Sequence, residues 1–203
     1  PQDWFGASVP IDGDVIVAGA PDPFDPFGPA AGPGDVFVGN DPEAGGGHLP
    51  DYNVYWFEEP LPIHDYEGHG KLAAESAVKI ATGENGYHLA HFKTLLDHKG
   101  ASILNVDVGI VPGYDVAMDI ANLAAERGVS IAPHGCQEIQ LPLVASIPHG
   151  DFLEIYPVAV DPLRAEMFQP LLKPDDDGFV TVPDTPGIGY ELNMDLLNRY
   201  RVG

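Results

Sequence analysis

Residues 53–60, written NVYWFEEP, place two carboxylates at the end of an aromatic, apolar run. The run is typical of a buried strand, but acidic residues are poor strand formers and Pro60 closes the segment at once. Glu58 and Glu59 therefore stand where a strand should be finishing. The runs that follow in the chain place ionisable residues in the same way.

Downstream of residue 51, short β-rich runs alternate with helical patterns. The further runs are residues 78–81, 102–106, 129–132 and 152–156. Apolar stripes at helical spacing separate some of them, formed by Phe92, Leu95 and Leu96 before Gly100 and by Val116, Ile120, Leu123 and Ala124 before Gly128. Alternation of this kind predicts an α/β fold built from parallel βα units.

Ionisable residues stand at or near the end of every run. After the first pair they are Glu84, Asp107, His134 and Glu154, at successive separations of 26, 23, 27 and 20 residues. Each separation is about one βα repeat, and in such folds the chemistry lies at the carboxyl ends of the strands. We therefore expect the groups to meet at one rim. Clustered carboxylates repel one another unless a cation compensates, and hard oxygen ligands favour Mg²⁺.

These residues lie in motifs that resemble those of the enolase superfamily, in its mandelate racemase-like and acid-sugar dehydratase subgroup. The motifs are WFEEP, HDYEGH, GEN, the Asp107–His134 pair, Glu154 and VPDTPGIGYELN, and they run from about Asn53 almost to the end of the chain. The resemblance implies the C-terminal part of a barrel. We therefore expect residues 51–203 to form an incomplete TIM-type (β/α) barrel of about five βα units.

The resemblance also implies a metal site. Glu58 and Glu84 would be Mg²⁺ ligands. Glu59 would make a structural ion pair or support the first ligand, and Asn85 would orient a ligand or cap the following turn. Mg²⁺ would stabilise the charge that develops on the substrate carboxylate when the neighbouring proton is removed.

A catalytic dyad is implied as well. Asp107 would fix the tautomer of His134, which would act as general base or acid. Glu154 would hydrogen-bond the substrate carboxylate or the developing enediolate. The implied reaction is abstraction of a proton α to a carboxylate, with dehydration of a sugar acid favoured. Racemisation or epimerisation of a 2-hydroxy acid remains open.

The chain departs from the family pattern, in which a barrel of eight units carries an N-terminal lid domain. The missing strands would supply a third carboxylate ligand and a Lys-x-Lys motif. No Lys-x-Lys occurs among Lys71, Lys79, Lys93, Lys99 and Lys173. We therefore expect a truncated chain with impaired activity, which forms a homo-oligomer or needs the missing half of the barrel. The competing interpretation is a non-catalytic fragment or a β-propeller-type binding module.

Residues 1–50 have a different character and predict a separate segment. They are rich in Gly, Pro and Asp and contain no Lys or Arg. FGASVPIDGDVIVAGAP followed by GDVFV resembles one FG-GAP repeat of integrin-type β-propellers, which predicts a small β segment and linker. The chain opens with Pro1 rather than Met, so we expect a processed or truncated product.

The acidic composition argues against several classes of partner. Acidic residues number 31 against 9 basic ones, a formal net charge of −22. Nucleic acid and anionic membrane surfaces are disfavoured because no basic patch could neutralise phosphates. No apolar run approaches the roughly 18 residues of a membrane span. The single cysteine, Cys136, favours a cytoplasmic setting.

Other residues that could take part in chemistry lack a supporting sequence pattern. Cys136 has no neighbouring motif of a nucleophile, so we expect it to pack. Six further histidines are interpreted as surface or core residues: His64, His69, His88, His91, His98 and His149.

Overall fold

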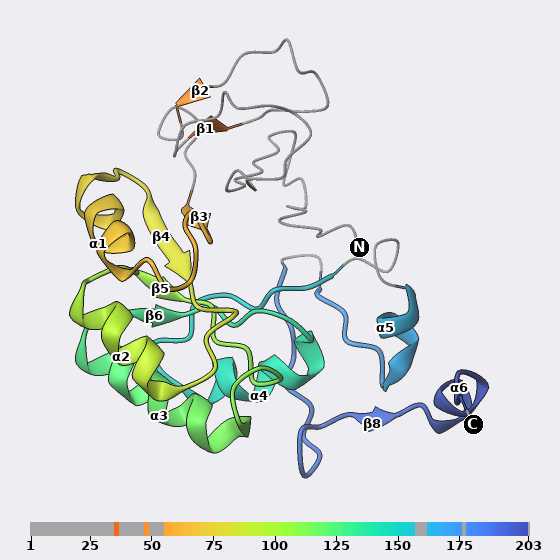
Figure 1. Ribbon diagram of the computed structural model, residues 1–203. Helices are drawn as coiled ribbons and strands as arrows, with labels where there is room; N and C mark the ends of the chain where they lie inside the picture. The colour runs from red at the N-terminus through yellow and green to blue at the C-terminus, as the bar shows by residue number, and fades with distance from the viewer. Residues whose placement is uncertain (1–34, 37–46, 49–54, 157–161, 176–177, 203) are drawn as a thin grey trace. The chain divides into compact units, whose positions relative to one another are not determined.

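The computed structural model describes residues 35–36, 47–48, 55–156, 162–175 and 178–202. The chain divides into two compact units. Unit 1 comprises residues up to Gly83 together with Ala90–Leu104, and unit 2 comprises Glu84–Leu89 together with Asn105 onward. Figure 1 labels the helices and strands in chain order.

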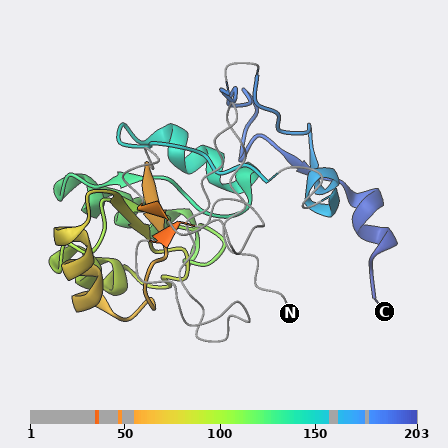
Figure 2. The same cartoon turned by 90° about the horizontal axis from the view of Figure 1, so that it is seen from above.

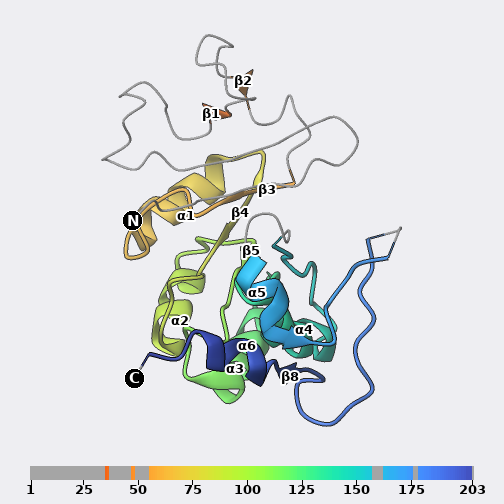
Figure 3. The ribbon, with the colours of Figure 1, turned by 90° about the vertical axis from the view of Figure 1, so that its right-hand side faces the viewer.

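Unit 1 contains parallel strands linked by helices, as the alternation predicted. Strand β3 (Trp56–Glu58) pairs in parallel with β4 (Lys79–Thr82), and β4 pairs in parallel with β5 (Ile103–Leu104). Helix α1 (Tyr66–Glu75) connects β3 to β4, and Figure 3 shows it running alongside these strands. Helix α2 (Leu89–Asp97) connects β4 to β5, and all of its residues except Leu89 belong to unit 1.

The core of unit 1 forms where the strands meet these helices. Phe57, Val78 and Ile80 are buried and pack against the partly buried Leu72 and Ala73 of α1. The stripe predicted for α2 is buried as well: Phe92, Leu95 and Leu96. Burial of each such side chain stabilises the fold by about 1.5–3 kcal/mol. This packing fixes the end of β3, where the first candidate carboxylates stand.

Unit 2 continues the strand–helix alternation. Helix α3 (Gly113–Glu126) precedes β6 (Ser130–Ile131), and α4 (Gln137–Ser146) follows that strand. The core-facing side of α3 consists of Ala117, Ile120, Ala121 and Ala124. The helix is followed by Gly128, whose φ of +68° is a left-handed conformation that glycine adopts without a steric penalty.

The strand predicted over residues 152–156 does not form. Ile131 of β6 makes a parallel bridge to Gly150, and the Asp151 amide donates to the Ile131 carbonyl at 2.7 Å. From residue 151 to 156 the backbone has no regular structure. The prediction at this position was therefore wrong, because a strand requires a hydrogen-bonding neighbour along its length and the recorded pairing with β6 ends at Asp151.

The C-terminal part of unit 2 contains short elements. Helix α5 (Pro162–Met167) is followed by β7 (Phe168–Gln169), which pairs antiparallel with β8 (Glu191–Leu192). Helix α6 (Met194–Arg199) begins after Asn193, whose side chain accepts a hydrogen bond from the Leu196 amide. Figure 2 shows α5 and α6 side by side.

Little of the N-terminal segment belongs to the described part of the chain. Strand β1 (Asp35–Val36) pairs antiparallel with β2 (Gly47–His48) in unit 1. The rest of the predicted FG-GAP-like segment lies outside the described residues. Among the helices that are described, none has the length and apolar character needed to cross a membrane.

Candidate functional site

The end of β3 in unit 1 carries Glu58 and Glu59 in different environments. Trp56 Nε1 donates to Glu58 Oε2 at 2.7 Å. Glu59 has a φ of +43°, a left-handed conformation that costs a non-glycine residue about 1–2 kcal/mol. Its Oε1 accepts hydrogen bonds from Thr82 Oγ1 at 2.7 Å and the Gly83 amide at 2.6 Å. Glu59 thus connects the ends of β3 and β4, which favours a supporting role.

Asp107 in unit 2 is buried and held by three donors. Its Oδ1 accepts from the Gly109 amide and from Gln140 Nε2, both at 2.7 Å, and its Oδ2 lies 3.1 Å from His134 Nδ1. A Cβ at Gly135 would collide with this carboxylate, and the φ of +99° at Gly135 also requires glycine. The local backbone therefore fixes the distance between the carboxylate and the imidazole.

His134 follows β6 and lies among carboxylates of the same unit. Its Nδ1 donates to Asp107, while its Nε2 lies 3.7 Å from Glu84 Oε2. Burial by itself would lower the pKa of His134. The Asp107 hydrogen bond and the charges of Glu84, Glu154 and Asp107 oppose it and raise that pKa to about 9. At neutral pH the imidazole is therefore protonated and able to act as a general acid.

Glu84 and Glu154 complete the group in unit 2. Glu154 Oε2 accepts from the Gly135 amide at 3.0 Å. Asn85 Nδ2 donates to Glu84 Oε1 at 3.4 Å, a long contact from an exposed side chain. The structure thus brings together four of the strand-end residues predicted from the sequence, namely Glu84, Asp107, His134 and Glu154. Glu58 and Glu59 belong to unit 1, with the contacts given above.

Two residues of this cluster were missed from the sequence. Gln140 is buried on α4, and its side chain contacts both Asp107 and the Val108 amide. The Tyr156 hydroxyl lies 3.2 Å from His134 Nε2. Tyr156 stands two residues after Glu154, and in extended chain such residues share a face, which could have indicated it. Gln140 could have been indicated by its position among apolar residues of the QEIQLPL stretch.

The described residues by themselves do not make a metal site. Nowhere among them do three or more His, Cys, Asp or Glu side chains gather in a way that could hold an ion. The carboxylate oxygens of Glu58 and Glu84 are of the hard type that Mg²⁺ prefers, but two carboxylates fall short of its octahedral shell.

Cys136 and the remaining histidines make contacts of their own. Burial and the charge of Glu138 raise the pKa of Cys136 to about 11, so the thiol remains protonated at neutral pH. His149 Nε2 contacts the Ala121 carbonyl at 2.9 Å. In unit 1, the Tyr66 hydroxyl lies 2.9 Å from His91 Nδ1 in a group of rings that also contains His64 and His98.

Acid is expected to destabilise unit 1 through His91. Burial and the neighbouring His64 and His69 lower the pKa of His91 to about 4. In the unfolded chain, His91 would bind a proton near its ordinary pKa of about 6.5. The stability that the folded state gains from neutral His91 is therefore fully present above pH 6.5 and is lost as the pH falls toward 4. We expect His91→Gln to reduce the loss of thermal stability between pH 7 and 4.5. Between pH 7 and 4.5, the wild type should lose about 1 kcal/mol more of its free energy of unfolding than the variant, once solvent screening is allowed for.

The control for that experiment is His88→Gln, at an exposed histidine in unit 2. Thermal unfolding would be followed by circular dichroism at both pH values. An identical pH dependence in the wild type and His91→Gln would contradict this interpretation of His91.

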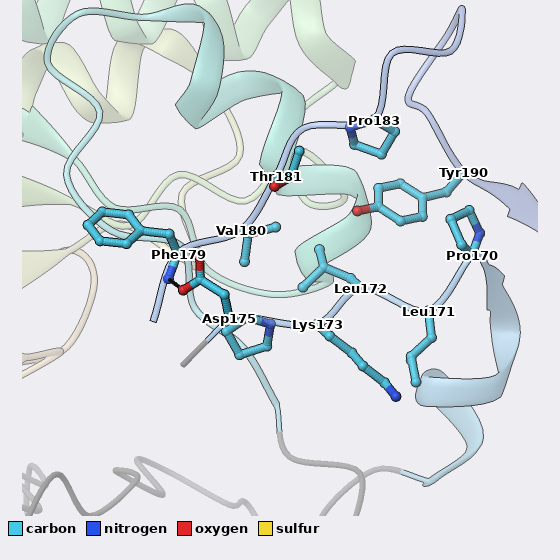
Figure 4. Close-up of a pocket in the computed structure, with 11 residues that line it drawn as sticks. Pro170, Leu171, Leu172, Lys173, Asp175, Phe179, Val180, Thr181, Pro183 and Tyr190 are labelled. Atoms are coloured by element: carbon cyan, nitrogen blue, oxygen red, sulfur yellow. Dashed lines mark hydrogen bonds between the residues drawn. The ribbon is translucent and has the colours of Figure 1, made fainter. Parts of the chain in front are cut away.

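A pocket lies in the C-terminal segment of unit 2 and is distinct from the cluster around His134. Its volume is about 370 Å³, and Figure 4 shows Leu172, Val180 and Tyr190 among its lining residues. The Phe179 amide donates to Asp175 Oδ1 at its edge. None of the candidate catalytic residues lines this pocket.

Comparison with known proteins gives a family match over most of the chain. A family model described as enolase C-terminal domain-like matches residues 44–196. The chain is 30% identical over 155 residues to 3,6-anhydro-alpha-L-galactonate cycloisomerase of Streptomyces coelicolor, covering 76% of this chain and 42% of that protein. It is 32% identical over 148 residues to L-talarate/galactarate dehydratase of Salmonella typhimurium, covering 73% and 36%.

A solved structure gives the same picture. The chain matches L-talarate dehydratase from Polaromonas sp. JS666, crystallised in complex with Mg and L-glucarate, with a TM-score of 0.65 and 32% identity. The match covers 73% of this chain and 40% of that one. The chain spans about two-fifths of the length of the relatives it matches. These matches confirm the predicted fold, an α/β chain that forms an incomplete TIM-type barrel.

Proposed function

Because the chain belongs to the enolase C-terminal domain-like family, we propose that it carries the acid–base residues of a sugar-acid dehydratase. The observation that supports this most is the position of His134, whose Nδ1 is held by Asp107 and whose Nε2 faces Glu84. Against the effect of burial, the neighbouring carboxylates raise its pKa to about 9, which suits a proton donor. Dehydration requires an acid that gives a proton to a departing hydroxyl group. Racemisation of a 2-hydroxy acid involves no departing hydroxyl group and is the alternative reaction at the same residues.

The proposed reaction assigns a role to each residue of the cluster. His134 donates the proton at Nε2 to the β-hydroxyl of the substrate, which leaves as water. Asp107 holds the ring through Nδ1 and stabilises its positive charge. Glu154, fixed by the Gly135 amide, hydrogen-bonds the substrate carboxylate or the enediolate that forms from it. We place the base that takes the α-proton on the remaining part of the barrel. Loss of that proton and of the β-hydroxyl as water gives an enol, which tautomerises to the 2-keto acid.

For the metal, we propose that Glu58 and Glu84 are this chain's contribution to a Mg²⁺ site. The Polaromonas sp. JS666 relative was crystallised with Mg, and both residues are carboxylates that follow strand-like runs. Mg²⁺ bound there would neutralise charge on the substrate carboxylate. Asn85 would orient Glu84 through its amide, and Glu59 would support the position of Glu58 by fixing the end of β3.

The substrate proposed is a small polyhydroxy carboxylate. The Salmonella typhimurium relative is named for talarate and galactarate, and the Polaromonas relative was crystallised with L-glucarate. We further propose that residues 51–203 carry this activity and that residues 1–50 form a separate segment. A homo-oligomer, or association with the remaining part of the barrel, would complete the site.

The experiment that tests this function is a screen of sugar acids for 2-keto product. The chain would be incubated with galactarate, talarate, glucarate and rhamnonate, with Mg²⁺ and separately with a chelator. We expect slow product formation from at least one acid, and less with the chelator. A folded protein that forms no 2-keto product from any of these acids would contradict the proposal.

A further inference from the structure

Tyr156 makes contacts that no role has so far explained. Its hydroxyl lies 3.2 Å from His134 Nε2, the nitrogen that would carry the transferred proton. Burial, and with it the charge of the Glu154 carboxylate, raises the pKa of this hydroxyl. Tyr156 therefore contacts one proposed catalytic side chain and is influenced by another, and all three residues belong to unit 2.

We infer that Tyr156 is a positioning residue for His134, whose imidazole it holds from the Nε2 side while Asp107 holds it from the Nδ1 side. The catalytic importance of this role rests on the proposed function, whereas the contact between Tyr156 and His134 can be tested without turnover. An imidazole ring makes hydrogen bonds through its two nitrogens. Asp107 contacts Nδ1 at 3.1 Å and the Tyr156 hydroxyl contacts Nε2 at 3.2 Å, so the ring is held on both sides.

The contacts run from Asp107 through His134 to Tyr156, and the charge of Glu154 acts on the Tyr156 hydroxyl. Burial and this charge raise the pKa of Tyr156, so the phenol keeps its proton at the imidazole.

The Tyr156 ring is itself held by a cation. The Arg164 guanidinium lies over its face, 4.5 Å from the ring centroid. Such a cation–π contact restricts movement of the ring. The hydroxyl is thereby kept at the imidazole, although Tyr156 belongs to a segment without regular secondary structure.

This arrangement has a consequence for substrate binding. The Tyr156 hydroxyl occupies the hydrogen-bonding position at His134 Nε2. A substrate hydroxyl must therefore take the place of the Tyr156 oxygen before it can exchange a proton with this nitrogen. Tyr156 thus holds the imidazole ready and shields Nε2 until a hydroxyl of the substrate arrives.

The test measures access to His134 Nε2 with diethyl pyrocarbonate, an electrophile that modifies unprotonated imidazole nitrogen. Modification rates at each histidine would be measured by peptide mass spectrometry in the wild type and Tyr156→Phe. Loss of the hydroxyl removes the group that contacts this nitrogen and shields it. We expect the rate at His134 to rise about 2- to 10-fold, the range of one lost hydrogen bond.

Matched variants separate this effect from a general loosening. Tyr114→Phe removes a hydroxyl that donates to the Ile139 carbonyl in the same unit, and it should leave the His134 rate unchanged. Tyr66→Phe removes the hydroxyl beside His91 and should raise the rate at His91 alone. His149, half-buried in unit 2, reports on unfolding, and its rate should not change in Tyr156→Phe.

A spectroscopic readout distinguishes positioning from packing. The NMR resonance of the His134 Nε2 nitrogen should shift in Tyr156→Phe, because the hydroxyl contact is lost while the ring packing is retained. Equal His134 modification rates and an unchanged resonance in Tyr156→Phe would overturn the inference. Parallel increases at His134 and His149 would also overturn it, because they would indicate unfolding. Both readouts work without turnover. They would therefore still test the role of Tyr156 if the sugar-acid screen gave no product.

Discussion

Replacing His134 by asparagine is expected to reduce sugar-acid dehydration by about 10²- to 10⁴-fold, the usual contribution of a general acid or base. The wild-type imidazole is protonated at neutral pH because three carboxylates outweigh the effect of burial on its pKa. Asparagine keeps a hydrogen-bonding side chain but cannot transfer a proton at this pH. The measurement is initial rate of 2-keto acid formation from the best substrate of the screen.

The matched control for this variant is His88→Asn, at an exposed histidine of the same unit. It should retain the wild-type rate. Circular dichroism would establish that His134→Asn is folded. If His134→Asn kept the wild-type rate, His134 would be a structural residue and the proposed mechanism would fail.

Asp107→Asn is expected to have an effect of similar size for a different reason. The carboxylate accepts from His134, Gln140 and the Gly109 amide, whereas an asparagine amide can accept through only one of its two atoms. One of the three donors would then face an N–H group. In a serine protease triad, the same kind of substitution holds the histidine in the wrong tautomer and costs about 10⁴-fold in kcat. We expect at least a 10²-fold fall in kcat.

The pKa of His134 supplies a second readout for this variant. Removal of the Asp107 charge and acceptor should lower it from about 9 toward the ordinary value of roughly 6.5. Asp115→Asn, at an exposed acid in the first turn of α3, is the control and should change neither kcat nor the His134 pKa. An Asp107→Asn enzyme with an unchanged kcat would show that the two residues do not act as a pair.

Much of the fold was predictable because helix periodicity is a local property. The stripe of Phe92, Leu95 and Leu96 is buried in α2, and Ile120 and Ala124 are buried in α3. The run at 152–156 shows where local patterns are insufficient. Its alternation is strand-like, but a strand depends on a neighbour that lies far away in the sequence, and pairing with β6 ends at Asp151.

The candidate site was predictable in part for the same reason. Regular spacing of strand ends indicated that Asp107, His134 and Glu154 would be near one another, and their contacts in unit 2 agree with this placement. Their catalytic roles remain predictions. Gln140 and Tyr156 could not be assigned, because their partners are known only once α4 and the segment after Gly150 are placed in space.

The central claim is that neighbouring carboxylates keep His134 protonated and ready to act as an acid. Titration of the His134 ring by NMR in the wild-type chain, with a chelator present, tests it most directly. The account predicts a pKa of about 9. A pKa near 6.5, the ordinary value for histidine, would contradict it.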